Sequence, residues 1–383
     1  MKPAFLFIFS FVFLVYFFAN WYIFSKGLRA IEITNYKTLF TWVFWILVVS
    51  FPLGQFLERA NPNAFFRLIS FAGSHYLVLL LYALIMVAFI DLVRLFDGWI
   101  NFIPQTIKSG ILSGENIFLF VSGISLILII VGHVNAANPI INKISIEVDK
   151  QAGSRNEIKA VLLTDIHMGV IIQNGRIQKM VNSINELNPD IILFGGDLVD
   201  HNPVPVIKKQ LGEYFKQLNP ELGMYAVTGN HEFIGHADVS IDYLSNFGIE
   251  YVRDTVINLG GVLNLAGRDD RDKPRFEEGE KRKDLADILN GIDSKLPLIL
   301  MDHQPVEYDK AESAGVDLML SGHTHKGQIW PFGYITSAIY ENHYGLIKKG
   351  NSHFYTSSGY GTWGPPVRIG NRPEIVEITI HLK

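Results

Sequence analysis

The first third of the chain is a series of long apolar runs separated by short polar breaks. Four of these runs reach the roughly 20 residues that a helix needs to cross a bilayer. They cover Ala4–Phe24, Thr38–Leu57, Leu68–Leu95 and Ile117–Asn135. Four such runs in succession, nearly free of internal charge, are not expected of buried helices in a soluble protein. The pattern therefore predicts a transmembrane region of four helices over residues 1–135.

The ends of these runs bear on topology. No small-residue cleavage site follows the first run, so we expect it to be retained as an anchor rather than removed as a signal peptide. Asp91 and Arg94 lie near the end of the third run, where we expect both side chains to reach the membrane interface. Lys and Arg counts on the two sides are too similar for the positive-inside rule to assign an orientation. We expect an integral, multi-pass protein of the cell membrane.

The pattern changes after Asn135. Residues 136–157 are expected to hold a linker and a first strand, because apolar and polar residues alternate from Ile144 to Val148. From Ile158 to the C-terminus, short apolar strands alternate with stretches of helical spacing, which predicts an α/β domain over residues 158–383. The expected strands are 158–163, 191–194, 224–227, 298–301, 318–320 and 374–382, and the expected helices are 175–187 and 204–218.

Polar clusters follow directly on five of these strands. They are Asp165-Ile-His167, Gly196-Asp197-Leu-Val-Asp200, Gly229-Asn230-His231-Glu232, Asp302-His303 and Gly322-His323-Thr-His325. Loops at the carboxyl ends of strands converge in α/β folds, so we expect these side chains to meet in one site. Asp, His and Asn supply oxygen and imidazole ligands, which suit Mn, Fe or Zn.

Composition narrows the chemistry further. The chain has no cysteine, which excludes thiolate ligands and a cysteine nucleophile. Its net charge of −4 gives no general attraction to nucleic acid, and no nucleic-acid partner is expected.

The five clusters, in this order, resemble the calcineurin-like metallophosphoesterases, and in particular their bacterial membrane-linked branch. The family pattern is D-x-H, G-D-x-x-D, G-N-H-[ED], a lone His and G-H-x-H. The resemblance implies a four-layer α/β sandwich with two mixed sheets and two divalent metal ions. It also implies hydrolysis of a phosphoester by a metal-activated hydroxide.

The same resemblance implies a role for each matching residue. One metal would be held by Asp165, His167, Asp197 and His325. The other would be held by Asp197, Asn230, His303 and His323, with Asp197 bridging the two ions. His231 would face the phosphate, either as general acid or as charge stabiliser, and Asp200 would orient its ring.

One departure bears on the substrate. Phosphoprotein phosphatases of this family carry Arg directly after the second Asp of their motif, where this chain has His201. A phosphodiester or another phosphoester is therefore favoured over a phosphoprotein. The four apolar runs beside the site suggest a lipid or a nucleotide-linked compound as its source. The alternatives are a catalytically silent, metal-binding membrane sensor or scaffold, and a transporter, for which the apolar runs offer few polar residues.

Three further segments are interpreted from their composition. Residues 268–283 are dense in both charges and are expected to form an exposed, mobile loop. Residues 357–368 are rich in Gly and Pro and form either a rim of the site or a structural loop. Lys326 contacts either an anionic substrate or only solvent, and His236, His343, His353 and His381 are expected to be ordinary surface residues.

Overall fold

The structure is a computed structural model that describes residues 3–60, 63–151, 153, 155–277 and 280–383. Its internal contacts divide it into two compact units. The first unit comprises Met1–His133 with Gly364–Val367, and the second comprises Val134–Trp363 with Arg368–Lys383. Each unit is described separately below.

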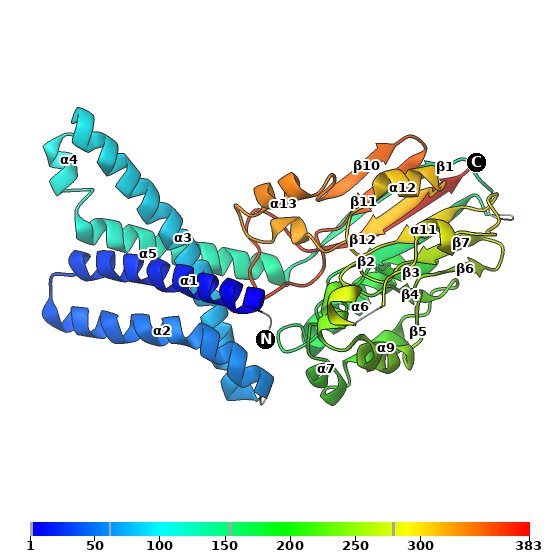
Figure 1. Ribbon diagram of the computed structural model, residues 1–383, viewed down its shortest axis with the longest axis horizontal. Coiled ribbons are helices and arrows are strands. Elements are labelled where there is room, and N and C mark those ends of the chain that lie inside the picture. The colour runs from blue at the N-terminus through cyan, green and yellow to red at the C-terminus, as the bar shows by residue number, and fades with distance from the viewer. Residues whose placement is uncertain (1–2, 61–62, 152, 154, 278–279) are drawn as a thin grey trace. The chain divides into compact units, whose positions relative to one another are not determined.

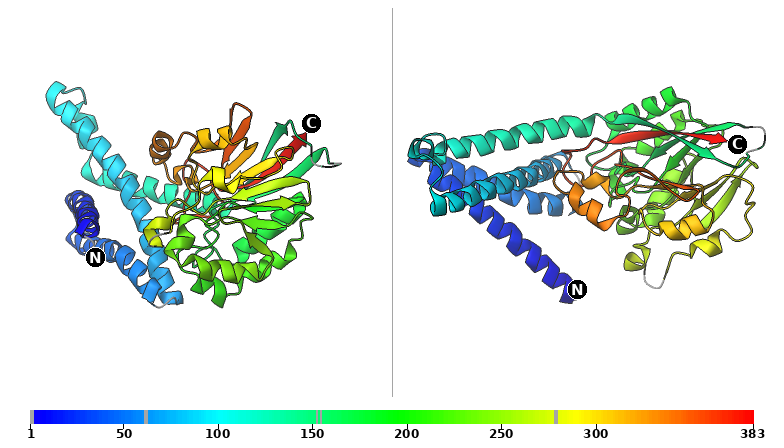
Figure 2. Two further views of the ribbon diagram at one scale, coloured as in Figure 1. Left: turned by 45° about the vertical axis from the view of Figure 1, so that its right-hand side comes forward. Right: turned by 90° about the horizontal axis from the view of Figure 1, so that it is seen from above.

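The first unit is built from long apolar helices (Figures 1 and 2). Its helices are α1 (Pro3–Ala30), α2 (Thr34–Ala60), α3 (Ala64–Ile100), the short α4 (Gln105–Ser109) and α5 (Gly114–Ala137), whose last turn passes into the second unit. Four of them are long and apolar enough to cross a membrane: Ser10–Ala30, Thr34–Leu57, Phe65–Ile100 and Gly114–Ala137. The prediction of four apolar helices is confirmed.

Two glycines let α2 and α3 approach closely. A Cβ on Gly54 would lie 2.6 Å from the Cα of Ser70, and one on Gly73 would lie 2.4 Å from the Cα of Phe51. Small residues of this kind allow backbone contact between apolar helices, whose association is driven by packing.

Some charged residues near the helix ends of this unit are paired with one another. The carboxylate of Asp91 accepts a hydrogen bond from Tyr22 (2.6 Å) and forms an ion pair with Lys26 of α1. A second ion pair joins Asp97 to Lys108. Because a charge is costly in an apolar environment unless it is paired, these contacts stabilise the charged side chains where the helices meet. The expectation that Asp91 and Arg94 reach the membrane interface stays a prediction.

The second unit contains two six-stranded mixed sheets. The first has the order β1-β12-β2-β3-β4-β5 and the second the order β10-β11-β9-β8-β7-β6. The strands of the first sheet are β1 (Ile140–Val148), β2 (Glu157–Leu163), β3 (Ile191–Phe194), β4 (Met224–Ala226), β5 (Ile249–Tyr251) and β12 (Glu374–Leu382). Those of the second are β6 (Thr255–Leu259), β7 (Leu263–Gly267), β8 (Leu298–Met301), β9 (Leu318–Ser321), β10 (Gly345–Lys349) and β11 (Ser352–Thr356).

The two sheets pack face to face, with helices outside each of them (Figure 1). One core lies between the sheets and includes Leu162 and Leu320. A second core lies between the first sheet and α6 (Asn174–Leu187), with the 3₁₀ helix η1 (Leu211–Gln217). A third lies between the second sheet and the short helices α11 (Leu285–Ile288) and α12 (Tyr308–Ser313). The predicted four-layer sandwich is thus confirmed.

The remaining helices are short. They are α7 (Val204–Lys208), α8 (Asn230–Ile234), α9 (Ala237–Ser245), α10 (Lys273–Phe276), the 3₁₀ turn η2 (His325–Gly327) and α13 (Gly333–Ile339). The single helix predicted over 204–218 is wrong, because Gln210 adopts a left-handed conformation (φ 52°) and separates α7 from η1. The predicted helix over 175–187 is present as α6, and its apolar face is buried as expected.

The charged segment 268–283 is only partly the exposed loop that its composition predicts, because Arg271, Arg275 and Lys281 are exposed but the start of the segment is buried. Arg268, Asp269 and Asp270 are buried, while residues 278 and 279 lie outside the described part of the chain. Arg268 pairs with Asp302 (3.1 Å) and Glu307 (2.7 Å). Charge density alone cannot distinguish a solvated loop from one whose charges are paired across the fold. His353 is also buried, on β11, and not a surface residue.

Candidate metal centre

The candidate ligands lie where neighbouring parallel strands end. Clusters after β2, β3 and β4 meet at one edge of the first sheet, because these strands are adjacent and parallel. Clusters after β8 and β9 meet at an edge of the second sheet in the same way. The two edges are joined by the backbone N–H of His323, which donates to Asp165 (3.1 Å), and by Nδ1 of His303, which donates to the carbonyl of Gly195 (2.8 Å).

The first group of candidate ligands combines Asp165, His167 and His325, all buried. The Nε2 atoms of the two histidines are 3.1 Å apart, and Nε2 of His325 is 3.3 Å from Oδ1 of Asp165. One ligand atom from each of the three residues lies within 4.8 Å of the others. A single ion can contact atoms at such spacings at once, since Zn–N and Zn–O distances are about 2 Å.

The second group combines Asp165, Asp197 and His303, again all buried. Nε2 of His303 lies 3.2 Å from Oδ2 of Asp197, which in turn lies 3.9 Å from Nε2 of His167. On the same side, Nδ1 of His323 lies 3.0 Å from Oδ1 of Asn230. Asp165 is common to both groups, and Asp197 lies between His303 of the second group and His167 of the first.

A third group places His231 against Asp200. Nδ1 of His231 lies 2.9 Å from Oδ1 of Asp200, and the rings of His231 and His167 are 4.6 Å apart. The same carboxylate oxygen accepts the backbone N–H of His201 (2.9 Å) and contacts its Nδ1 (2.8 Å). Asp200 thus holds two imidazole rings beside the first group of ligands.

The backbone around the site is held in an uncommon conformation. Asp165, His167, Asp197, His323 and His325 all have positive φ, between 48° and 70°. Such angles are rare for residues with a side chain and are often found where surrounding structure forces a functional geometry. Two glycines make room for the carboxylates, because a Cβ on Gly229 would lie 2.1 Å from Oδ1 of Asp197 and one on Gly322 would lie 2.3 Å from Oδ2 of Asp165.

Burial and charge set the protonation of the histidines. Burial lowers the pKa of His167 to about 4 and that of His323 to about 3, so both rings are neutral, the form in which imidazole binds a metal. Burial also acts to lower the pKa of His303, but the negative charges of Asp197 and Asp165 outweigh it and raise that pKa well above its usual range. Negative charge that favours a proton on this ring also favours a cation between ring and carboxylate.

His231 has the opposite character to His167 and His323. Burial acts to lower its pKa, but the charge of Asp197 and the hydrogen bond to Asp200 outweigh it and raise the pKa to about 9. Desolvation would likewise raise the pKa of Asp200, yet hydrogen bonds from His201 and His231 hold it well below its usual range. Without bound metal, His231 and Asp200 therefore form a pair of a cationic ring and a carboxylate. Divalent cations bound at Asp197 would lower the pKa of His231 again, because they cancel the negative charge that raises it.

Two residues support the site without having been singled out in the sequence. The buried carboxylate of Glu232 accepts the backbone N–H groups of Gly229 (2.7 Å), Asp197 (3.0 Å) and Val199 (3.1 Å), and so ties the loop after β3 to α8. The motif G-N-H-E places Glu232 near the site, but the sequence does not indicate that its carboxylate accepts three backbone N–H groups.

Arg368 is the second such residue. Its hydrogen bonds hold segment 357–368 in place beside the candidate ligand His325. It is fully buried and donates to the carbonyls of Ser358 (2.6 Å) and Gly361 (2.7 Å) and to Nδ1 of His325 (3.2 Å). Burial lowers its pKa to about 10, which leaves it charged at neutral pH. The segment is therefore fastened against the site by a buried cation. The partners of Arg368 could not be predicted from the sequence.

We expect Arg368→Met to destabilise the second unit, because the substitution leaves buried carbonyls without their donor. The cost is about 3 kcal/mol or more, which corresponds to a loss of roughly 6–12 °C in thermal midpoint for a domain of 150–250 residues. Thermal unfolding of the full-length protein in detergent measures it. The matched change Arg275→Met, at a side chain that is 74% exposed, should shift the midpoint by no more than about 2 °C. Equal shifts in both variants would contradict this role of Arg368.

The family described as calcineurin-like phosphoesterase matches residues 158–327. A transmembrane protein with metallophosphoesterase domain from Danio rerio is 33% identical over 269 residues, which are 67% of this chain and 61% of that protein. An uncharacterized metallophosphoesterase from Aquifex aeolicus is 33% identical over 245 residues, which are 63% of this chain and 92% of that protein. Another from Campylobacter jejuni is 28% identical over 388 residues, which are 98% of this chain and 99% of that protein.

The chain belongs to the calcineurin-like metallophosphoesterases, as its motifs predicted. This family uses a dinuclear metal centre, and the chain carries groups of residues that can bind metal. Four long apolar helices, together with the transmembrane relative, support association with a membrane.

Proposed function

We propose that this chain is a membrane-anchored phosphoesterase with two divalent metal ions, which hydrolyses a phosphodiester or another phosphoester. The observation that carries the proposal is the meeting of two buried ligand groups at Asp165 and Asp197, with His231 held beside them. The four apolar helices of the first unit support the anchor.

The donor set fits two ions of the Mn, Fe or Zn class. One would be held by Asp165, His167, Asp197 and His325, and the other by Asp197, Asn230, His303 and His323. Nε2 of His303 supports this assignment, since it is buried and lies 3.2 Å from Oδ2 of Asp197, where both atoms could bind one ion. Its other nitrogen donates to a backbone carbonyl, the arrangement that usually orients a metal-binding histidine. Such a pair of ions activates a water for attack and neutralises the phosphoryl oxygens.

His231 and Asp200 are the groups we assign to the phosphate. With Nδ1 directed at Asp200, the ring presents Nε2–H for donation, as in other carboxylate–imidazole pairs. That proton can pass to the leaving oxygen or remain to stabilise developing charge. Asp200 keeps the ring oriented and charged, and His201 takes the position at which phosphoprotein phosphatases carry arginine.

The proposal is tested with purified full-length protein and bis-p-nitrophenyl phosphate. After treatment with chelator, activity should be absent. It should return on addition of Mn²⁺, Fe²⁺ or Zn²⁺, because nucleophile activation depends on the bound ions. Metal analysis should find two ions for each chain. Two bound ions with no hydrolysis of mono- or diesters under any of these metals would instead favour the silent sensor or scaffold.

A further inference from the structure

An apolar surface lies next to the candidate metal centre. Directly after His325 the chain forms η2 and α13, and α13 buries none of its side chains. Five large apolar residues between positions 330 and 339 are exposed: Trp330 (46%), Phe332 (41%), Tyr334 (71%), Ile335 (54%) and Ile339 (67%). Trp363 is 59% exposed. We call these six residues the α13 patch. Exposed apolar residues grouped on one segment, when they form a contiguous patch, often mark an interaction surface.

The α13 patch is fixed to the site rather than freely mobile. Gln328 and Trp363 are joined by two reciprocal hydrogen bonds, both 2.8 Å long, between the Gln328 side chain and the Trp363 backbone. The backbone N–H of Trp330 donates to the carbonyl of Ile369 (2.8 Å). The ring of Tyr340, just after α13, is 5.9 Å from that of the candidate ligand His323. Whatever covers the patch therefore lies beside the metal centre.

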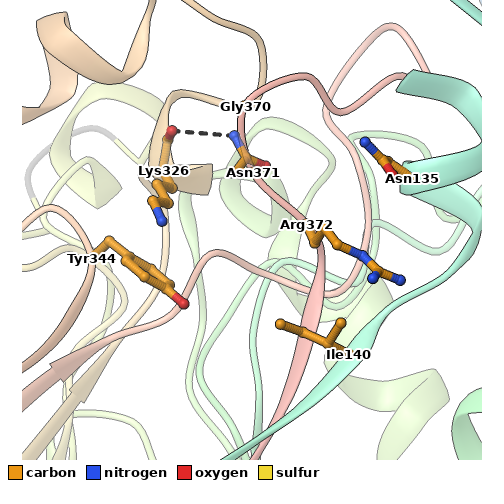
Figure 3. Close-up of a pocket in the computed structure, with 7 residues that line it drawn as sticks. All are labelled: Asn135, Ile140, Lys326, Tyr344, Gly370, Asn371 and Arg372. Atoms are coloured by element: carbon orange, nitrogen blue, oxygen red, sulfur yellow. Dashed lines mark hydrogen bonds between the residues drawn. The ribbon is translucent and has the colours of Figure 1, made fainter. Parts of the chain in front are cut away.

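A cationic pocket adjoins the α13 patch at Gly370. Its lining residues are drawn in Figure 3. It has a volume of about 350 Å³ and is lined by Asn135, Ile140, Lys326, Tyr344, Gly370, Asn371 and Arg372. Its lining carries two cations and no acidic residue. Glu374, which accepts a hydrogen bond from the Tyr344 hydroxyl (3.3 Å), is buried and engaged by Tyr355, Ser357 and Ser358. Pocket and patch are continuous, since a Cβ on Gly370 would lie 3.2 Å from that of Trp330.

The pocket also includes the end of an apolar helix. Asn135 lies two residues before the end of α5, in the apolar stretch Gly114–Ala137, and Ile140 begins β1. If α5 crosses a bilayer, its last turn lies at the level of the lipid headgroups. Lys326 and Arg372 then stand where anionic headgroups are found, next to aromatic and aliphatic side chains of the kind enriched at membrane interfaces.

From this juxtaposition we propose that the α13 patch and its cationic pocket form a face that contacts the bilayer, with the apolar side chains entering the interface and Lys326 and Arg372 binding anionic headgroups. The partner is the lipid surface itself. This contact does not depend on the proposed hydrolysis, but it would bring the opening of the metal site to the level of lipid phosphates. A lipid-linked phosphoester would then be the substrate class nearest the site.

The test exploits the absence of cysteine from the chain. Ile335→Cys introduces a single thiol on the α13 patch, and Val239→Cys is the matched control on α9, where the native side chain is 45% exposed. Each full-length variant is labelled with a polarity-sensitive dye and reconstituted in vesicles of phosphatidylcholine and phosphatidylglycerol. A bromine-bearing lipid should quench the Ile335→Cys dye at least about twofold more than the control, because interfacial side chains enter roughly 5–10 Å into the headgroup and acyl boundary. Equal quenching at both sites overturns the proposal.

A second arm tests the headgroup contact. Lys326→Gln with Arg372→Gln, in the Ile335→Cys background, should weaken quenching in vesicles with phosphatidylglycerol but have little effect in phosphatidylcholine alone. The equilibrium constant between the lipid-bound and the free state of the α13 patch, obtained from the quenched fraction, should fall about fivefold for each cation removed. An unchanged signal would refute the role of the two cations. Hydrolysis of bis-p-nitrophenyl phosphate, measured in the same vesicles, reports separately on the proposed enzyme, so failure of one proposal is distinguishable from failure of the other.

Discussion

Replacing Asp197 with asparagine is expected to abolish hydrolysis and to reduce the metal content from two ions to one or none. Asp197 lies between the two ligand groups, 3.2 Å from Nε2 of His303 and 3.9 Å from that of His167. An amide has the same shape but no charge, so it bridges two cations poorly. Bound metal supplies several kcal/mol of transition-state stabilisation, and we therefore expect kcat to fall by about 10³-fold or more.

Metal analysis and steady-state kinetics on the same preparation measure this effect. Asp242→Asn, on the exposed face of α9, is the matched control and should retain two ions and full activity. Loss of activity through unfolding is checked by the thermal midpoint in chelator: Asp197→Asn should still unfold cooperatively above the assay temperature, although it loses the contact of the carboxylate with His303. A variant that kept two ions and wild-type kcat would show that Asp197 is not the bridge.

The positions of the candidate ligands could be predicted because each follows a buried strand. The strands ending before Asp165, Asp197 and His303 were recognisable as short apolar runs, and the carboxyl ends of neighbouring parallel strands must lie together. Local pattern was therefore enough to bring together residues more than 100 positions apart.

Contacts that depend on partners distant in sequence could not be predicted. Arg268 is a buried cation whose acceptors Asp302 and Glu307 come from another segment, and the buried Arg368 contacts His325 from 43 positions away; no local pattern indicates these partners. The break at Gln210 likewise depends on one backbone angle rather than on apolar spacing. In β6 and β10, the alternation of apolar and polar residues is too short to distinguish a strand from a loop.

Replacing His231 with alanine is expected to reduce kcat by about 10² to 10⁴-fold on a diester with an alkyl leaving group, the usual range for loss of a general acid. The ring is held by Asp200 at 2.9 Å and lies against His167, so its proton is available next to the metal centre. The effect on a p-nitrophenyl ester should be much smaller, about tenfold or less, because that leaving group departs without protonation. Kinetics on the two esters, with Mn²⁺ in both assays, measure the difference.

The comparison of the two esters decides between the two roles of His231. If the ring only stabilises charge on the phosphoryl oxygens, both esters should lose the same factor, since that charge is present whichever group leaves. His381→Ala, at a 46% exposed ring on β12, is the control and should leave both rates unchanged. Asp200→Asn should follow the pattern of His231→Ala with a smaller loss, because it weakens the orientation and charge of the ring but leaves the imidazole in place. A larger loss on the p-nitrophenyl ester than on the alkyl ester would contradict both roles.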